Sequence, residues 1–149
     1  MRVYVTLILA LGLVVFSGCK KNESTPETLE AYIKRLGITD AVKDDRGFYY
    51  KIITEGTGVN PTVSNNVTIF YKGMFTNGNI FDQTEANPAT FLLGNLILGW
   101  KLGLPLIKPG GSIILYLPPS LAYGDNPDPR SGIPPNSVLI FEIKLVSVQ

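Results

Sequence analysis

From residue 48 onward, the order of hydrophobic and polar residues along the chain predicts β-strands. Four segments carry the signal, by alternation or by richness in aromatic and β-branched residues: residues 48–54, 67–75, 112–117 and 138–148. In the second segment, Val67, Ile69 and Tyr71 fall on one side of the chain. Successive side chains of a strand point to opposite faces, so we expect these three to share one face of a sheet.

A hairpin and one short helix complete the predicted main domain. Asn77-Gly78 is a strong hairpin signal, and a fifth strand is expected to begin at Ile80-Phe81. Within this domain helical spacing is confined to residues 96–104, where Pro105 ends the run; its apolar positions are Leu96, Ile97, Trp100 and Leu104. Antiparallel strands, about five of them, around one short helix make an α+β domain.

The segment before residue 47 predicts a second helix. Thr25 is expected as the N-cap, with Pro26 at the first helical position, and Gly37 is expected to end the helix. The spacing of its apolar residues gives one narrow stripe, formed by Leu29, Tyr32, Ile33 and Leu36. Such a stripe must dock on something. We favour docking on the chain's own domain over pairing with a second copy, although a homodimer through this helix stays an alternative.

The N-terminal residues have the pattern of a secretory signal. Residues 3–16 form an almost unbroken apolar run, shorter than the about 20 residues of a membrane span. The following Ser17-Gly18-Cys19 resembles the lipobox of bacterial lipoproteins, in which cleavage leaves Cys19 as a lipidated N-terminus. An ordinary signal peptide or a buried cysteine is the alternative. The predicted parts are a lipoprotein signal peptide at 1–18, a lipidated tether with its helix at 19–46, and the main domain at 47–149.

Composition narrows the possible chemistry. The 149 residues include no histidine and one cysteine, with 13 Lys and Arg against 12 Asp and Glu. The lack of histidine excludes Ser-His-Asp and Cys-His catalysis and any His-metal site. A single cysteine excludes an internal disulfide. Near-balanced charge argues against nucleic acid as the main partner. Carboxylates, aromatic rings, hydroxyls and backbone groups remain.

A series of short motifs resembles the FKBP family of peptidyl-prolyl isomerases. In chain order they are VTIFYKG at 67–73, NG at 77–78, FD at 81–82, F at 91, ILGW at 97–100, KPG at 108–110, LPP at 117–119, LAYG at 121–124, IPPN at 133–136 and LIF at 139–141. Each motif alone is weak evidence, but their order and spacing together are highly specific. The similarity spans roughly residues 49–148 and implies a sheet wrapped around the helix at 96–104, with the active site between them.

The resemblance also implies which residues form the site. The expected catalytic residues are Tyr71, Phe81, Asp82, Trp100, Tyr123 and Phe141. Those expected to bind substrate are Phe91, Leu96, Ile97 and Ile133. In the family pattern Trp100 is the floor of the pocket, Asp82 meets the Tyr71 hydroxyl, and the backbone N–H of Ile133 is offered to the substrate carbonyl. No cofactor and no metal are implied.

The chemistry of prolyl isomerisation suits these residue types. An Xaa-Pro amide rotates slowly because resonance stabilises its planar form. An apolar pocket that strips water from the amide carbonyl favours the twisted form, without a nucleophile or a general base. The predicted function is therefore peptidyl-prolyl isomerisation. A lipoprotein that binds proline-containing segments without turnover, or acts as a chaperone, is the alternative, because aromatic grooves also bind such segments.

The signal and the pocket together predict partners and location. The expected partners are proline-containing polypeptides, as folding clients, and a membrane through the N-terminal lipid. The expected location is the cell envelope, with the protein anchored to the outer membrane and facing the periplasm or the cell surface. Lys20 follows the cysteine, whereas Asp at that position is associated with inner-membrane retention.

Overall fold

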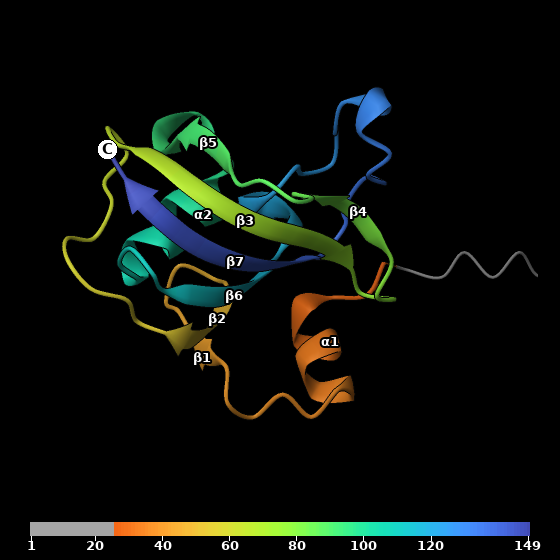
Figure 1. The fold of residues 1–149 in the computed structure, drawn as a ribbon. Helices are drawn as coiled ribbons and strands as arrows, with labels where there is room; N and C mark the ends of the chain where they lie inside the picture. Colours follow the sequence, from red (N-terminus) through yellow and green to blue (C-terminus); the bar gives the residue numbers. More distant parts are fainter. Residues whose placement is uncertain (1–25) are drawn as a thin grey trace, which may run out of the picture.

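One antiparallel sheet organises residues 26–149, the part of the chain that the computed structural model describes (Figure 1). Its strands are β1 (Val42–Lys43), β2 (Tyr49–Thr54), β3 (Asn66–Phe75), β4 (Ile80–Gln83), β5 (Ala89–Leu92), β6 (Ser112–Leu117) and β7 (Leu139–Val148). Their order is β1-β2-β6-β7-β3-β4, and β5 also pairs with β3. The predicted signal peptide, the lipobox with Cys19, and Thr25 lie outside the described residues.

The α+β fold is confirmed, but the sheet has two more strands than the predicted five. The additional strands are β1 and β5. Strand β1 has only two residues, too few to show a periodic pattern. Strand β5 pairs with the first part of β3 and β4 pairs with the last part, so both lie on one edge of the same ten-residue strand. The sequence predicts one return strand where the structure has two short ones.

Helix α2 (Leu98–Gly103) lies against the inner face of the curved sheet (Figure 1). Gly99 and Gly103 make the close approach possible, because a Cβ at either position would overlap the side chain of Leu117 or Leu115 on β6. The helix is shorter than the predicted span of residues 96–104. Its N-cap is Ile97, which has extended backbone like Leu96 before it. Leu96 and Ile97 therefore fit the helical spacing of apolar residues in the sequence, but they precede the helix.

Helix α1 (Leu29–Arg35) packs on the opposite face of the sheet. Three residues of the predicted stripe, Leu29, Tyr32 and Ile33, are buried there. They share a cluster with Tyr116 of β6, Ile140 of β7 and Val138, which directly precedes β7. The prediction that the helix docks on its own domain is confirmed. Because this apolar face is already covered, the structure gives no support to a homodimer through it.

The ends of α1 differ in part from the prediction. Thr28 is the N-cap, and its hydroxyl accepts a hydrogen bond from the backbone N–H of Ala31 at 3.2 Å. Pro26 therefore precedes the helix instead of beginning it. Leu36 is the C-cap and is 51% exposed, so it does not belong to the buried stripe. The left-handed Gly37 (φ +61°) follows the helix end, as predicted. Neither described α-helix is long and apolar enough to span a membrane.

Candidate active site

An aromatic pocket of about 280 Å³ opens on the inner side of the sheet. Strands β3, β4, β5 and β7, helix α2 and the segments beside it supply the lining residues: Tyr71, Asp82, Phe91, Asn95, Leu96, Ile97, Trp100, Tyr123 and Phe141. The structure thus brings together every predicted site residue within its described part, apart from Phe81 and Ile133. These residues come from segments up to 70 positions apart in the chain, so the fold as a whole assembles the pocket.

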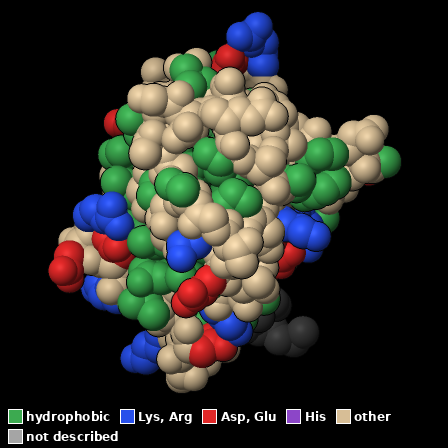
Figure 2. All heavy atoms as spheres, turned by 60° about the vertical axis from the view of Figure 1, so that its left-hand side comes forward, with side chains coloured by type: hydrophobic (Ala, Val, Ile, Leu, Met, Phe, Trp, Pro, Cys, Tyr) green, Lys and Arg blue, Asp and Glu red, His purple; other side chains and the backbone are tan. Residues whose placement is uncertain are grey.

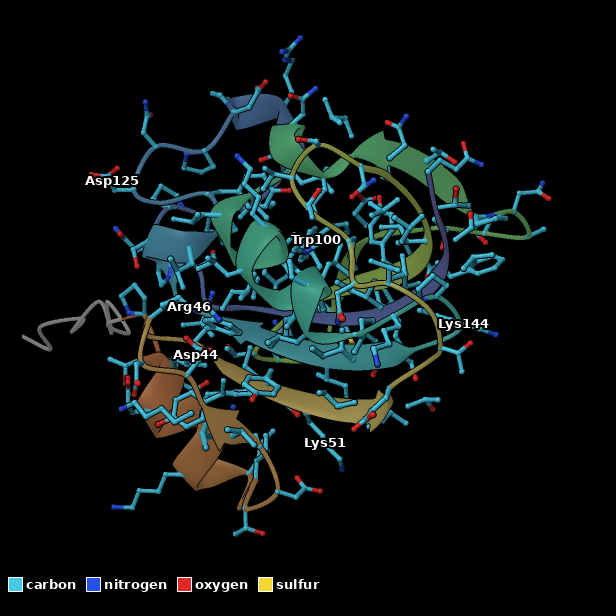
Figure 3. All side chains as sticks on the ribbon, turned by 90° about the vertical axis from the view of Figure 1, so that its left-hand side faces the viewer. Asp44, Arg46, Lys51, Trp100, Asp125 and Lys144 are labelled. Carbon is cyan, nitrogen blue, oxygen red and sulfur yellow. The ribbon has the colours of Figure 1, made fainter. Side chains whose placement is uncertain are left out.

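Trp100 organises the aromatic walls of the pocket. It is 5% exposed and lies near the centre of the molecule (Figure 3). The ring of Tyr71 stands edge-on to it with a centroid distance of 5.2 Å, and so does the ring of Phe141, also at 5.2 Å. Edge-to-face aromatic pairs contribute about 0.5–1.5 kcal/mol each beyond the burial of their area. The walls are therefore fixed in orientation before any ligand binds.

Phe81 packs on the lining residue Phe141 and is not itself among the residues that line the pocket. Its ring packs edge-on against Phe141 with a centroid distance of 5.7 Å, and it packs in a tilted arrangement against Phe75 at 5.0 Å. The pairing of β3 with β4 shifts register here, so Phe81 is the extra residue of a bulge, which changes the direction of its side chain. Its ring also covers Gly73, where a Cβ would lie 2.6 Å from the Phe81 ring. The predicted wall residue thus contacts the pocket through Phe141.

Asp82 and Tyr71 form the polar edge of the pocket. The Tyr71 hydroxyl donates a hydrogen bond to the Asp82 carboxylate at 2.6 Å, the contact that the family pattern implies. Burial raises the pKa of the Tyr71 phenol above its ordinary value, and the hydrogen bond to Asp82 raises it further. The phenol therefore stays protonated and remains a donor across the physiological pH range.

The indole N–H of Trp100 and the hydroxyl of Tyr123 are two further polar groups of the site. The indole N–H of Trp100 is buried and has no hydrogen-bond partner among the described residues. An unpaired buried donor costs about 1–3 kcal/mol. Tyr123 lies at the rim and is 40% exposed; partial burial raises the pKa of its phenol, with a further contribution from the charge of Asp82.

Ile133 is buried in the core and does not line the pocket. Its backbone N–H, which the family pattern offers to the substrate carbonyl, donates instead to the Ser131 hydroxyl at 3.2 Å. Ser131 in turn donates to the backbone carbonyl of Asp128 at 2.7 Å. The turn between them depends on Gly132, which has a left-handed backbone (φ +69°). Ile133 N–H thus already has a partner within its own loop.

Asn95 also lines the pocket, although it is not among the predicted site residues. It ends the 3₁₀ turn Leu93–Asn95, directly before Leu96. Its position beside a predicted lining residue is the one signal in the sequence that points to it.

A larger cavity of about 430 Å³ lies on the outer face of the sheet. The residues that line it include Phe70, Lys72, Glu142 and Lys144. The charge of Glu142 is already paired there, since Lys72 Nζ lies 2.7 Å from its carboxylate. The aromatic cluster lies on the other side of the sheet. We therefore place the candidate site in the smaller pocket around Trp100.

The curved antiparallel sheet, the short helix on its inner face and the aromatic pocket with its Tyr–Asp pair place the chain among the FKBP-like isomerase domains. Residues 58–146 match the family model described as FKBP-type peptidyl-prolyl cis-trans isomerase. The chain belongs to this family.

Known relatives agree with this assignment. The chain is 38% identical over 129 residues to the probable FKBP-type isomerase FkpA of Neisseria meningitidis, covering 85% of this chain and 47% of that protein. It is 44% identical over 108 residues to the outer membrane protein MIP of Legionella longbeachae, covering 69% and 45%. The crystal structure of FkpA from Escherichia coli superposes with a TM-score of 0.74 at 38% identity, covering 80% of this chain and 56% of that chain. The chain spans about half the length of the curated relatives it matches.

Proposed function

We propose that this chain catalyses the cis-trans isomerisation of Xaa-Pro bonds in exported polypeptides. One observation carries the proposal: edge-to-face aromatic rings surround Trp100, and the Tyr71–Asp82 hydrogen bond lies at the edge of the same pocket. The reaction is rotation about one amide bond, with an uncatalysed barrier of about 18–20 kcal/mol. It needs no bond cleavage, so a pocket of aromatic rings and hydroxyls has the groups required.

The proposed mechanism is desolvation with selective binding of the twisted amide. The planar amide has a large dipole that water stabilises, and the twisted amide has a smaller carbonyl dipole. Burying the prolyl amide against Trp100 and Phe141 removes that water, which raises the energy of the planar form relative to the twisted form. An acceleration of about 10⁵-fold requires about 7 kcal/mol of such preference.

Polar groups at the pocket would orient the substrate carbonyl. The Tyr123 hydroxyl at the rim is suited to donate to it. The family resemblance assigns the same role to the backbone N–H of Ile133, which would first have to leave the Ser131 hydroxyl. We assign the lining residues Phe91, Leu96 and Ile97 to substrate binding, and the Tyr71–Asp82 pair and the rings around it to catalysis.

The proposed location is the cell envelope. The apolar run at residues 3–16 and the lipobox-like Cys19 support a lipid anchor on the mature chain. The relationship to an outer membrane protein of Legionella longbeachae agrees with that location. The isomerase domain, residues 47–149, would then act on proline-containing clients in the periplasm or at the cell surface, with residues 19–46 as tether and docked helix.

The test is the rate of cis-to-trans isomerisation of an Xaa-Leu-Pro-Phe peptide by the protein produced without residues 1–18. We expect acceleration over the spontaneous rate and, in Trp100→Leu, a loss of at least about ten-fold in kcat/KM. Phe70→Leu is the matched control, because Phe70 is an aromatic residue of β3 on the outer face of the sheet. No acceleration by a folded sample would favour the alternative, a protein that binds proline-containing segments without turnover.

A further inference from the structure

Strand β3 changes its partner strand at the residue that reaches into the pocket. Along one edge of β3, residues 66–69 pair with β5 and residues 72–74 pair with β4. Tyr71 lies in the gap between the two partners. A backbone group left without a strand partner at such a gap must be satisfied in another way.

Thr84 closes the gap in the hydrogen-bond ladder. Its backbone N–H donates to the Tyr71 carbonyl at 3.0 Å, as expected for an antiparallel pair. The return bond is unusual: the Tyr71 N–H donates to the Thr84 hydroxyl oxygen, also at 3.0 Å, instead of to a backbone carbonyl. The same hydroxyl lies 3.3 Å from the Tyr71 carbonyl, to which it donates. The side chain replaces the backbone because strand β4 ends at Gln83, directly before Thr84, and the chain re-enters the sheet only at Ala89.

The same short segment also holds the other end of Tyr71. Asp82, two positions before Thr84, accepts the hydrogen bond from the Tyr71 hydroxyl at 2.6 Å. Residues 82–84 thus hold Tyr71 at its backbone and at the tip of its side chain. Between these two points, the ring stands edge-on to Trp100.

We propose that Thr84 is a positioning residue of the isomerase site, which fixes Tyr71 through its hydroxyl and, through the segment 82–84, fixes Asp82 as well. This inference rests on the proposed function. Thr84 does not line the aromatic pocket, so it acts through Tyr71 and not on the substrate. A pocket that discriminates a twisted from a planar amide depends on wall positions fixed to a fraction of an ångström.

The test compares three substitutions by activity and by amide hydrogen exchange in the same protein. Thr84→Val removes the hydroxyl at constant shape, and Thr84→Ser keeps it. Thr90→Val is the matched control, because the Thr90 hydroxyl bonds to the Thr68 hydroxyl at 2.8 Å on the same edge of β3. In Thr84→Val we expect kcat/KM to fall about ten-fold, while the other two variants stay within about two-fold of wild type. The Tyr71 amide should exchange faster in Thr84→Val alone.

Several results would overturn the inference. Wild-type activity in Thr84→Val would do so, and so would an equal loss in Thr84→Val and Thr84→Ser, because the hydroxyl would then not be the cause. If Thr84→Val does not fold, Thr84→Ala removes the same hydroxyl and the same outcomes apply. An inactive but folded wild type would contradict the proposed function instead. The exchange of the Tyr71 amide would then still show whether Thr84 holds Tyr71.

Discussion

Tyr71 contributes to the pocket through three different groups. Its ring packs against Trp100, its hydroxyl donates to Asp82, and its backbone bonds to Thr84. A ring without these polar contacts would still fill space, but its position would be set by packing alone. Of the three contacts, the hydrogen bond to Asp82 has the most direct consequence for protonation.

The raised pKa of the Tyr71 phenol predicts a loss of stability at high pH. In the unfolded chain this phenol ionises near its ordinary value of 10.0, whereas burial and then the bond to Asp82 raise the pKa in the folded protein. The folded state therefore holds the proton more tightly. The resulting stabilisation is fully present below pH 10 and is lost as the pH rises from 10 through the folded pKa.

Urea unfolding at pH 8 and pH 11 tests this prediction. We expect the free energy of unfolding to fall less between the two pH values in Tyr71→Phe than in wild type, because phenylalanine has no proton to lose. Burial also raises the pKa of Tyr32 and Tyr116, but these phenols are present in both proteins and their contribution cancels in the comparison. An equal decrease in both proteins would contradict the predicted role of Tyr71.

The sequence motifs predict most of the pocket, and the exceptions have local backbone causes. Trp100 and Phe141 line the pocket, as the family resemblance implies. Phe81 falls at a bulge, which depends on the pairing of β3 with β4 and not on the alternation along one strand. Ile133 N–H is engaged by Ser131 because of the left-handed Gly132 between them. Thr84 has no motif, since its role arises only where two strands share one edge of β3.

Helix α2 brings the pocket floor close to the sheet. Gly103 and Gly99 lie four residues apart on the face that contacts β6, and the Leu115 and Leu117 side chains occupy the space where a Cβ would be. Glycine at these two positions lowers the helix propensity of α2 and allows the helix to lie closer to the sheet. Lower helix propensity decreases the free energy of unfolding, whereas closer packing increases it. A substitution of one of these glycines therefore shows which of the two effects is larger.

Gly103→Ala is predicted to destabilise the protein. Helix propensity alone favours alanine over glycine by about 1 kcal/mol. In the structure, however, the new Cβ would lie 2.6 Å from a Leu115 methyl group in a packed interface. Overpacking of a core costs about 1–3 kcal/mol, so we expect a net decrease in the free energy of unfolding, measured in urea. Lys101→Ala, elsewhere on the same helix, is the control. A more stable Gly103→Ala would show that propensity outweighs the close contact.

Secondary structure was predictable where a pattern extends over many residues. Strands β3 and β7 have ten residues each, and their alternation places Ile69 and Leu145 correctly in the core. The ends of helices were less predictable, because a cap depends on a single hydrogen bond. Both Thr25 and Thr28 are suitable N-cap residues by type, and the observed bond from Ala31 N–H identifies Thr28.

The sheet separates two hydrophobic clusters, of which one forms the pocket and the other holds helix α1. The inner cluster contains helix α2 and the walls of the pocket, and the outer cluster contains α1 with its contacts on β6 and β7. Lys and Arg side chains lie next to Asp and Glu on the face shown in Figure 2, as the near-balanced charge suggests. At the scale of the whole molecule, stability and catalysis are therefore expected to respond to different substitutions.

Ile33→Ala tests whether the two clusters are independent. Ile33 is 9% exposed in the outer cluster, so its truncation should lower the free energy of unfolding by about 2–4 kcal/mol. We expect kcat/KM to stay within about two-fold of wild type at temperatures where the variant is folded, because the sheet separates α1 from Trp100. Leu36→Ala is the matched control. It belongs to the same predicted stripe but is 51% exposed, so it should change the free energy of unfolding by less than about 0.5 kcal/mol.

One contact connects helix α1 with the turn that leads to the pocket. Arg35 pairs with Glu27 at 2.7 Å and also donates to the Thr76 carbonyl at 3.3 Å, in the turn that leads into β4 and Asp82. This link is long and exposed to solvent, so it should transmit little to the pocket. If Ile33→Ala nevertheless lowered kcat/KM as strongly as Trp100→Leu, the clusters would be coupled through this turn. An equal effect in Arg35→Met would then identify the Thr76 contact as the route.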